Sequence, residues 1–207
     1  MKVNYVGIVG GILAFISLVL SWWTMALSVS VMGVGLSGDF SIYPYQARVS
    51  MMGFSAGVPV DLWYGWVALA FVVVGGALAI AGSLIAYGKK LILVGGALVI
   101  LSISIFAIGL QMWLSTMTSL PAGAIGFTGL SGVGLFSSGT ASFGTGGTTM
   151  TMNYSTYLSF GFWLALVSAI VMFVALGIRP KEAAPAPPQP SPVPQQAPPE
   201  SPPPPGP

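Results

Sequence analysis

The chain contains no cysteine and no histidine. The missing thiols exclude disulfide bonds, thiolate metal sites and a catalytic cysteine, and the missing imidazoles exclude histidine as a base or metal ligand. Charge is also scarce, because six basic and four acidic residues make up only 5% of the 207-residue chain. Soluble domains carry about 25% charged residues, so the composition predicts a membrane protein. Six scattered basic residues are too few for a nucleic-acid-binding surface, and we expect no nucleic-acid partner.

Long apolar runs take the place of charge, and the mean hydropathy is +0.89. Two runs lie back to back around residues 62–114, and only Lys89-Lys90 separates them. Each exceeds the roughly 20 residues that cross a hydrocarbon core of about 30 Å. Two further runs lie near the ends of a membrane domain that we place at residues 1–182. We predict four transmembrane helices, at residues 6–26, 62–88, 91–114 and 157–178.

The basic residues predict the orientation of these helices, because lysine and arginine gather on the cytoplasmic side of a membrane. In a four-span chain only Arg48 falls on the outer side. The other five basic residues fall on the inner side: Lys2, Lys89, Lys90, Arg179 and Lys181. We therefore expect a multi-pass protein of the cell membrane with both termini in the cytoplasm and two outer loops, at residues 27–61 and 115–156.

The first apolar run has two interpretations. Lys2, an apolar centre and the small residues around Ala26 have the outline of a cleaved signal peptide. The run is long for such a peptide, however, and Trp22-Trp23 is typical of an interfacial anchor that keeps a helix in the membrane. Cleavage would leave three spans, and the sequence alone leaves this alternative open.

The two outer loops favour β-structure, and the C-terminal tail favours disorder. Residues 28–31 and 148–152 alternate or are rich in β-branched residues, as strands are. A lone hairpin is marginal in water, so we expect one joined sheet built from both loops. The proline-rich residues 183–207 cannot form a core and are expected to be a disordered cytoplasmic tail. The predicted fold is therefore a membrane all-α class, a four-transmembrane-helix bundle with a small β-rich extracellular layer.

Small residues spaced along the apolar runs predict where the helices pack. Lipid tails are as apolar as leucine, so helices in a membrane associate through close approach across glycine and alanine. The candidate packing positions are Gly7, Gly11, Gly75, Ala79, Gly95, Gly96, Gly161 and Ala165.

The two halves of the chain repeat short patterns. Val9-Gly10-Gly11 resembles Val94-Gly95-Gly96, and residues 33–36 and 132–135 both read Gly-Val-Gly-Leu. An old duplication and chance similarity among common membrane residues both explain this.

The layout of four helices with β-rich outer loops resembles that of claudins and tetraspanins. The claudin first-loop pattern of tryptophans with two cysteines is absent, and so is the tetraspanin Cys-Cys-Gly. The resemblance therefore concerns the layout only, and it implies no functional residue.

The sequence offers little for catalysis or transport. The predicted spans contain no ionisable side chain of the kind that ion and proton transporters keep there. The outer side has only Asp39, Arg48 and Asp61 as charges, and Asp61 is placed to act as the N-cap of the second helix. We therefore predict that the protein is not an enzyme and needs no cofactor.

Two sites in the second outer loop are further candidates. Met150 and Met152 place two thioethers on one strand face, which would suit Cu(I), although methionine also fills gaps in protein cores. Asn153-Tyr154-Ser155 is a sequon for N-glycosylation.

Two function classes remain after these exclusions. The first is a non-enzymatic structural or protein-interaction role through the outer loops, which are polar but nearly uncharged. The alternative is an accessory subunit of a membrane-bound enzyme or transporter complex. The expected partners are the lipid bilayer together with further copies of the chain or other membrane or envelope proteins.

Overall fold

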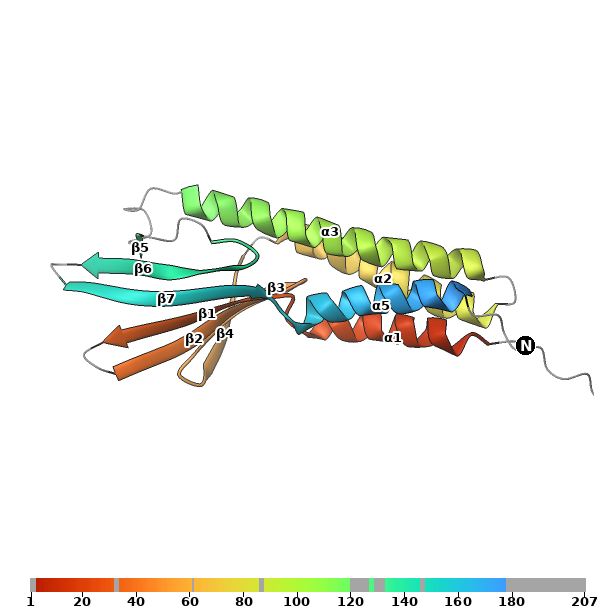
Figure 1. Cartoon of the computed structure of the whole chain (residues 1–207), viewed down its shortest axis with the longest axis horizontal. Coiled ribbons are helices and arrows are strands. Elements are labelled where there is room, and N and C mark those ends of the chain that lie inside the picture. The colour runs from red at the N-terminus through yellow and green to blue at the C-terminus, as the bar shows by residue number, and fades with distance from the viewer. Residues whose placement is uncertain are drawn as a thin grey trace, which may run out of the picture.

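A computed structural model of the chain describes residues 3–31, 34–60, 62–85, 88–119, 127–128, 133–145 and 148–177. A bundle of helices lies at one end of its long axis and an antiparallel sheet at the other (Figure 1). The helices are α1 Tyr5–Val19, α2 Trp63–Leu84, α3 Lys89–Ser119 and α5 Phe160–Gly177. The strands are β1 Trp23–Val31, β2 Val34–Tyr43, β3 Gln46–Met51, β4 Phe54–Val58, β5 Phe127–Thr128, β6 Ser137–Thr145 and β7 Thr148–Leu158.

The four helices of the described residues form a ring in which α1 and α3 each pack against both α2 and α5. Three of them are long and apolar enough to cross a membrane, namely α2, residues Lys89–Thr116 of α3, and α5. The remaining helix, α1, is equally apolar in character but has only 15 residues.

The first helix is shorter than the sequence predicts, and the prediction that it continues to residue 26 is wrong. It ends at Val19, and Leu20 already has an extended backbone with φ −99° and ψ 152°. The Trp22 backbone N–H donates to the Ile42 carbonyl oxygen at 2.8 Å. Residues from Trp23 onward pair on one side with β2 and on the other with β7. These pairings between distant segments outweigh the local apolar pattern that favours a continued helix.

The tryptophan pair is correspondingly not an interfacial anchor, because both side chains are fully buried where the bundle meets the sheet. The Trp22 indole N–H donates to the Ser17 carbonyl oxygen at 2.9 Å. Its ring lies edge-on to Phe106 of α3 and Phe162 of α5, with centroids 4.9 and 6.2 Å away. Trp22 therefore joins three helices at the base of the sheet.

Both outer loops contribute to one sheet with the strand order β4-β3-β2-β1-β7-β6-β5. The expectation of a joined sheet is thus confirmed, and the joint is the antiparallel pairing of β1 with β7. Strand residues begin at Trp23, before the predicted start of the first loop, and β7 continues to Leu158. As a result α5 begins at Phe160 rather than at residue 157.

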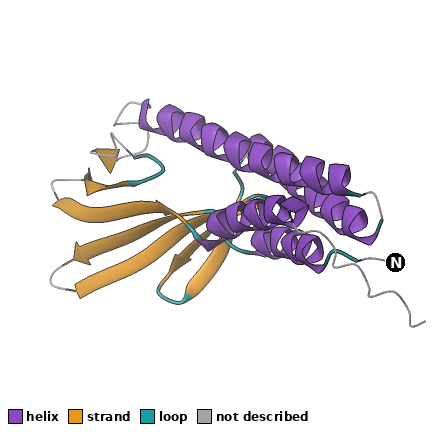
Figure 2. Cartoon of the chain, turned by 45° about the vertical axis from the view of Figure 1, so that its right-hand side comes forward, coloured by secondary structure: helices purple, strands orange, loops and turns teal. Residues whose placement is uncertain are grey.

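The third helix is the longest, and it extends beyond the other helices alongside the sheet (Figures 1 and 2). Its 31 residues span about 46 Å at 1.5 Å per residue, more than a hydrocarbon core requires. Leu110 and Leu114 are buried, and Trp113 stacks on Phe40 of β2 at 6.4 Å with an interplanar angle of 12°. Contact with the apolar face of the sheet explains why the helix continues to Ser119 instead of ending near residue 114.

The second helix differs from the prediction at both ends. It ends at Leu84 rather than at residue 88, and its N-cap position is Leu62. The sequence predicts Asp61 as this cap, and Asp61 lies outside the described residues. The proline-rich tail also lies outside them.

Most of the candidate packing residues lie where two helices meet, and Gly161 lies against the extended segment after α1. A Cβ atom built on Gly75 of α2 would lie 2.7 Å from the Gly95 carbonyl oxygen of α3, and one on Gly11 of α1 would lie 2.8 Å from the Gly76 carbonyl oxygen. Gly7 lies against the Ser83 hydroxyl, and Gly96 lies against Phe173. Gly161 lies against the Trp22 ring and the carbonyl oxygens of the two residues before Trp22. Ala79 and Ala165 are fully buried. Backbones therefore approach closely at Gly11, Gly75, Gly95 and Gly161, which is how helices associate in lipid, whereas Gly7 and Gly96 lie against side chains.

The two Gly-Val-Gly-Leu patterns lie at different places in the fold. Val34 opens β2 opposite Val31, at the end of the hairpin farthest from α1. Val133 precedes β6, whose first residue Ser137 pairs with Thr156 near the start of α5. The two Gly-Val-Gly-Leu segments are therefore similar in sequence but do not occupy equivalent positions in the sheet. Gly33 and Gly132 lie outside the described residues.

Asn4 ties the helices together at the end of the bundle opposite the sheet. Its amide Nδ2 donates to the Ala175 carbonyl oxygen of α5 at 2.9 Å, and its Oδ1 accepts from the Gly7 backbone N–H at 3.4 Å. Its backbone N–H donates to the Ser83 carbonyl oxygen of α2 at 3.0 Å. At the same end the Lys89 ammonium donates to the Leu176 carbonyl oxygen at 3.3 Å, where a positive charge favours a helix C-terminus.

Replacing Asn4 with alanine should therefore destabilise the bundle. The variant loses an N-cap and an interhelical hydrogen bond, and we expect the free energy of unfolding to fall by about 1 to 2 kcal/mol. Titration of the purified protein with a denaturing detergent measures this. Asn4→Ser is the matched control, because serine still caps the helix and only the bond to Ala175 is lost. Equal stability of all three proteins would contradict the role assigned to Asn4.

Candidate interaction surface

The outside of the bundle is more apolar than its inside. Helix positions that face inward are mostly small, and the fully buried serines Ser17, Ser102 and Ser168 each donate to a backbone carbonyl. Helix positions that face outward carry large apolar side chains that are 37–82% exposed, such as Ile12, Val74, Leu101, Ile170 and Val174. A water-facing bundle has the opposite arrangement. The described helices thus define a membrane-associated protein.

Exposed aromatic side chains gather where the bundle meets the sheet. Trp63 and Trp66 of α2 are 61% and 58% exposed, and Phe160 and Trp163 of α5 are 82% and 47% exposed. Tyr157, at the end of β7, is also exposed. Tryptophan and tyrosine favour the boundary between lipid and water, so this aromatic belt at the base of the sheet has the composition of a membrane boundary.

The sheet beyond this belt has two unlike faces, because alternate residues of a strand point to opposite sides. One face carries Trp23, Met25, Leu27 and Val29 of β1, which pack into the core. The other face carries the residues between them and their partners on neighbouring strands. We call it the open face and define it by two rows in register, Ser37-Ser28-Asn153-Thr140 and Asp39-Ala26-Ser155-Ser138.

The first row of the open face is fully exposed and entirely neutral. Ser37, Ser28, Asn153 and Thr140 are all exposed. Within the described part of the chain, none of these four side chains makes a hydrogen bond. Neighbouring strands lie about 4.8 Å apart, so the row presents hydroxyl and amide groups at regular intervals over about 14 Å. Such a row can donate and accept hydrogen bonds, but it attracts ions of neither sign.

The two charged residues of the sheet are held by neutral neighbours. Asp39 accepts a hydrogen bond from the Ser41 hydroxyl at 3.2 Å, and Ser41 in turn lies 3.2 Å from the Thr24 hydroxyl. The Arg48 guanidinium lies over the Tyr43 ring, 5.3 Å from its centroid. The carboxylate and the guanidinium therefore engage separate partners on the sheet.

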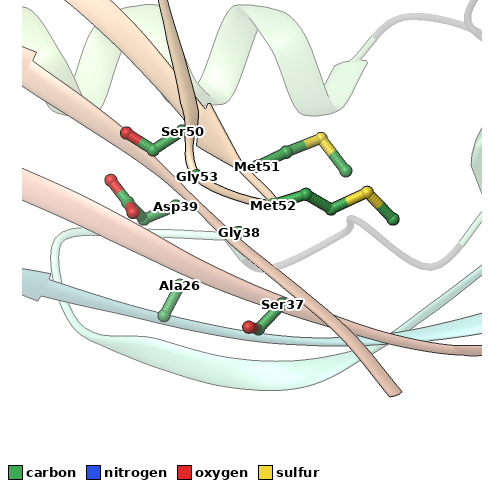
Figure 3. A pocket seen from close by; sticks show the side chains of 8 residues that line it. All are labelled: Ala26, Ser37, Gly38, Asp39, Ser50, Met51, Met52 and Gly53. Carbon is green, nitrogen blue, oxygen red and sulfur yellow. The ribbon is translucent and has the colours of Figure 1, made fainter. Parts of the chain in front are cut away.

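A shallow concavity of about 390 Å³ borders the open face near the turn between β3 and β4 (Figure 3). Ser37, Asp39 and Ser50 contribute polar groups, and Met51 and Met52 line the opposite side. Met52 has φ +52° and Gly53 has φ +83°, a tight turn in which a methionine occupies the left-handed region. One carboxylate and two hydroxyls offer no paired acid and base or activated nucleophile. Among the residues described, no group of three His, Cys, Asp or Glu side chains could hold a metal.

The two candidate sites in the second loop lie on different faces of β7. Met152 is 7% exposed and lies in the core beside Ala141 and Val29, so its thioether is not presented for copper binding from solution. The side chain of Met150 lies outside the described residues. Asn153 is exposed but lies in the middle of a strand, in the first row of the open face.

The sequence does not predict the open face, although it contains one pattern typical of a polar strand face. Serine, threonine and asparagine alternate with larger residues at 28–30 and 151–155. The register that places Ser28 beside Asn153 joins segments more than 120 residues apart, and local patterns do not contain it.

No protein-family model matches the chain, and no curated protein matches its sequence. The geometry of the described residues is therefore the basis for assigning a function.

Proposed function

We propose that the protein crosses the membrane four times and uses its extracellular sheet to contact neighbouring proteins, without catalysing a reaction. The observation that carries this proposal is a bundle with large apolar side chains on its outside, joined to a sheet whose open face carries exposed hydroxyl and amide groups and little charge. Interface cores are depleted of charged residues. Among the eight residues of the two rows only Asp39 is charged, and Arg48 lies in the next row on the same side of the sheet, opposite Ser41.

The contacts between α1 and α5 support a crossing by the short first helix. Asn4 contacts Ala175 at one end of α5, and the Gly161 backbone N–H donates to the Ser21 carbonyl oxygen at 2.9 Å at the other. Residues 5–21 thus run the whole length of α5, which is long enough to cross a membrane. The helix spans about 22 Å, and the extended residues after it add about 10 Å. If α5 crosses the bilayer, α1 crosses beside it.

The described lysines support the proposed orientation. Lys89 and Lys90 begin α3 at the end of the bundle opposite the sheet. Because lysine favours the cytoplasmic side, the sheet belongs on the outer side of the cell membrane.

Arginine substitution on the open face tests the interaction role. Ser28→Arg combined with Asn153→Arg places two like charges on adjacent strands, and both side chains remain solvent-exposed. We expect the variant to insert and fold normally but to lose at least about tenfold of its affinity for its neighbour, because unpaired charges are costly in an interface. Cross-linking in intact cells followed by mass spectrometry measures the complex. Ser28→Thr with Asn153→Ser is the matched control.

Unchanged cross-linking of the arginine variant would refute the interaction role of the open face. Stoichiometric recovery with a redox or transport enzyme would replace the proposal with an accessory-subunit function. Recovery with further copies of the chain, or with surface-layer proteins, would support it.

A further inference from the structure

Arg48 is an exposed cation close to the base of the sheet. It follows Ala47, which is buried opposite Ile42 where the sheet meets the bundle. The turn before β3 packs on the first turn of α2, because a Cβ atom on Gly65 would collide with the Pro44 carbonyl oxygen. Figure 1 accordingly shows β3 at the end of the sheet nearest the helices. The long side chain of Arg48 can therefore reach the level of the aromatic belt while its stem lies along the sheet.

Two neighbours hold the Arg48 guanidinium in place. It lies over the Tyr43 ring, 5.3 Å from the centroid. With the Gln46 amide turned so that its oxygen faces the guanidinium, this oxygen accepts from Nε and Nη2 of Arg48 at 2.9 and 2.8 Å. Tyr43 and Gln46 are themselves paired across β2 and β3. A side chain that is already fixed by its neighbours loses little further freedom when it binds a ligand.

The positive charge of Arg48 has no carboxylate partner within the described part of the chain. Asp39, on the same side of the sheet, accepts from the Ser41 hydroxyl instead. A guanidinium has five N–H donors, and Gln46 takes two of them, so three remain. These include the outer edge formed by Nη1 and Nη2, and such an edge matches two oxygens of a phosphate group.

We propose that Arg48 binds the phosphate group of a phospholipid in the outer leaflet, with Tyr43 and Gln46 as positioning residues. Phosphate oxygens are the anionic acceptors of phospholipid headgroups, and the aromatic belt places Arg48 at the headgroup level. The inference rests on the membrane crossing in the proposed function, but not on the interaction role of the open face. Cysteine labelling measures the crossing by itself, so a failed phosphate contact and a failed crossing are distinguishable.

A distance measurement in bilayers tests the proposal. Arg179→Lys leaves Arg48 as the sole arginine of the full-length chain, which is labelled with carbon-13 arginine and reconstituted into frozen dioleoyl phosphatidylcholine bilayers. Solid-state NMR then measures the distance from Cζ to the lipid phosphorus. Paired hydrogen bonds to a phosphate place the phosphorus about 4 Å from Cζ, and we expect this distance. An inserted protein without a phosphorus contact at Cζ would overturn the proposal.

Moving the arginine along the sheet provides the matched control. Arg48→Lys combined with Ser28→Arg, on the Arg179→Lys background, transfers the sole arginine to the first row of the open face. This row lies four residues farther from the base than the row of Arg48, or about 13 Å along the strands. We expect no phosphorus contact there. Equal contact at residues 28 and 48 would overturn the site, because headgroups would then meet any arginine of the sheet.

Lipid retention tests the contribution of the guanidinium and of the ring beneath it. Native mass spectrometry of the full-length protein in maltoside detergent counts the retained phosphatidylcholine. Arg48→Gln should weaken retention at least about tenfold, the equivalent of one hydrogen bond to a charged group. Tyr43→Leu should weaken retention as well, whereas Tyr43→Phe keeps the ring and should not. Unchanged retention in Arg48→Gln would overturn the proposal, and equal losses from both Tyr43 variants would overturn the positioning role of the ring.

Inorganic phosphate separates the two sources of this chemistry. It is titrated into the lipid-free protein in a phosphate-free detergent buffer, and the Arg48 Nε resonance is followed by NMR. We expect no saturation at millimolar phosphate, because a free ion lacks the bilayer that brings the headgroup to the site. Saturable binding of inorganic phosphate that Arg48→Gln abolishes would assign the site to a soluble ion and overturn the lipid as its ligand.

Discussion

Replacing Gly75 with leucine is expected to separate α2 from α3 and to abolish the folded bundle. A Cβ atom at this position already meets the Gly95 carbonyl oxygen at 2.7 Å and a Val99 methyl at 3.0 Å. Two backbones cannot give way as a flexible side chain does, so the helices must move apart along their whole contact. We expect a loss of about 3 kcal/mol or more in the free energy of unfolding, measured by denaturing-detergent titration.

Val74→Leu is the matched control for this prediction. Val74 precedes Gly75 in the same helix, but its side chain is 49% exposed on the outside of the bundle. We expect this variant to unfold at nearly the same detergent fraction as the wild type. Equal losses from both substitutions would show that the closeness of α2 and α3 is not what stabilises the bundle.

Replacing Trp22 with alanine is the second substitution with a large expected effect. Trp22 is fully buried, contacts Phe106 and Phe162, and donates its indole N–H to Ser17. Removing it leaves a cavity between the bundle and the base of the sheet, and large-to-alanine substitutions of buried aromatic residues cost about 3 to 5 kcal/mol. Thermal unfolding of the purified variant, followed by circular dichroism, measures the loss.

Trp66→Ala provides the comparison for Trp22. Trp66 is 58% exposed in the aromatic belt, and truncation of an exposed side chain usually changes stability by about 0.5 kcal/mol or less. A larger loss at Trp66 than at Trp22 would contradict the assignment of Trp22 to the core and of Trp66 to the lipid boundary.

The sequence predicts the apolar helices well, because membrane crossing imposes a strong local constraint on composition. Uncharged runs of sufficient length identify α2, α3 and α5. Alternation and the weakness of lone hairpins likewise predict a joined sheet. The errors lie where distant segments decide the outcome. Residues 20–26 continue an apolar run, yet the helix ends at Val19, and pairing with β2 and β7 makes residues 23–26 the start of a strand.

The candidate surfaces depend even more on distant contacts. The open face exists because β1 and β7 pair in one particular register, which a shift of one residue would destroy. The overhang of α3 exists because the helix continues along the apolar face of the sheet. Neither the register nor the overhang has a signature in the residues nearby. The scarcity of charge on the open face, however, is visible in the composition.

Labelling of single introduced cysteines in intact cells tests the central claim most directly, since the chain has no cysteine of its own. The Ser28→Cys variant places its cysteine on the open face. The Tyr5→Cys and Lys90→Cys variants place theirs at the opposite end of the bundle, where the Tyr5 side chain is 74% exposed. With a membrane-impermeant maleimide, four crossings predict labelling at residue 28 in intact cells and at residues 5 and 90 only after permeabilisation. Labelling of residue 5 in intact cells, or protection of residue 28, would contradict the account.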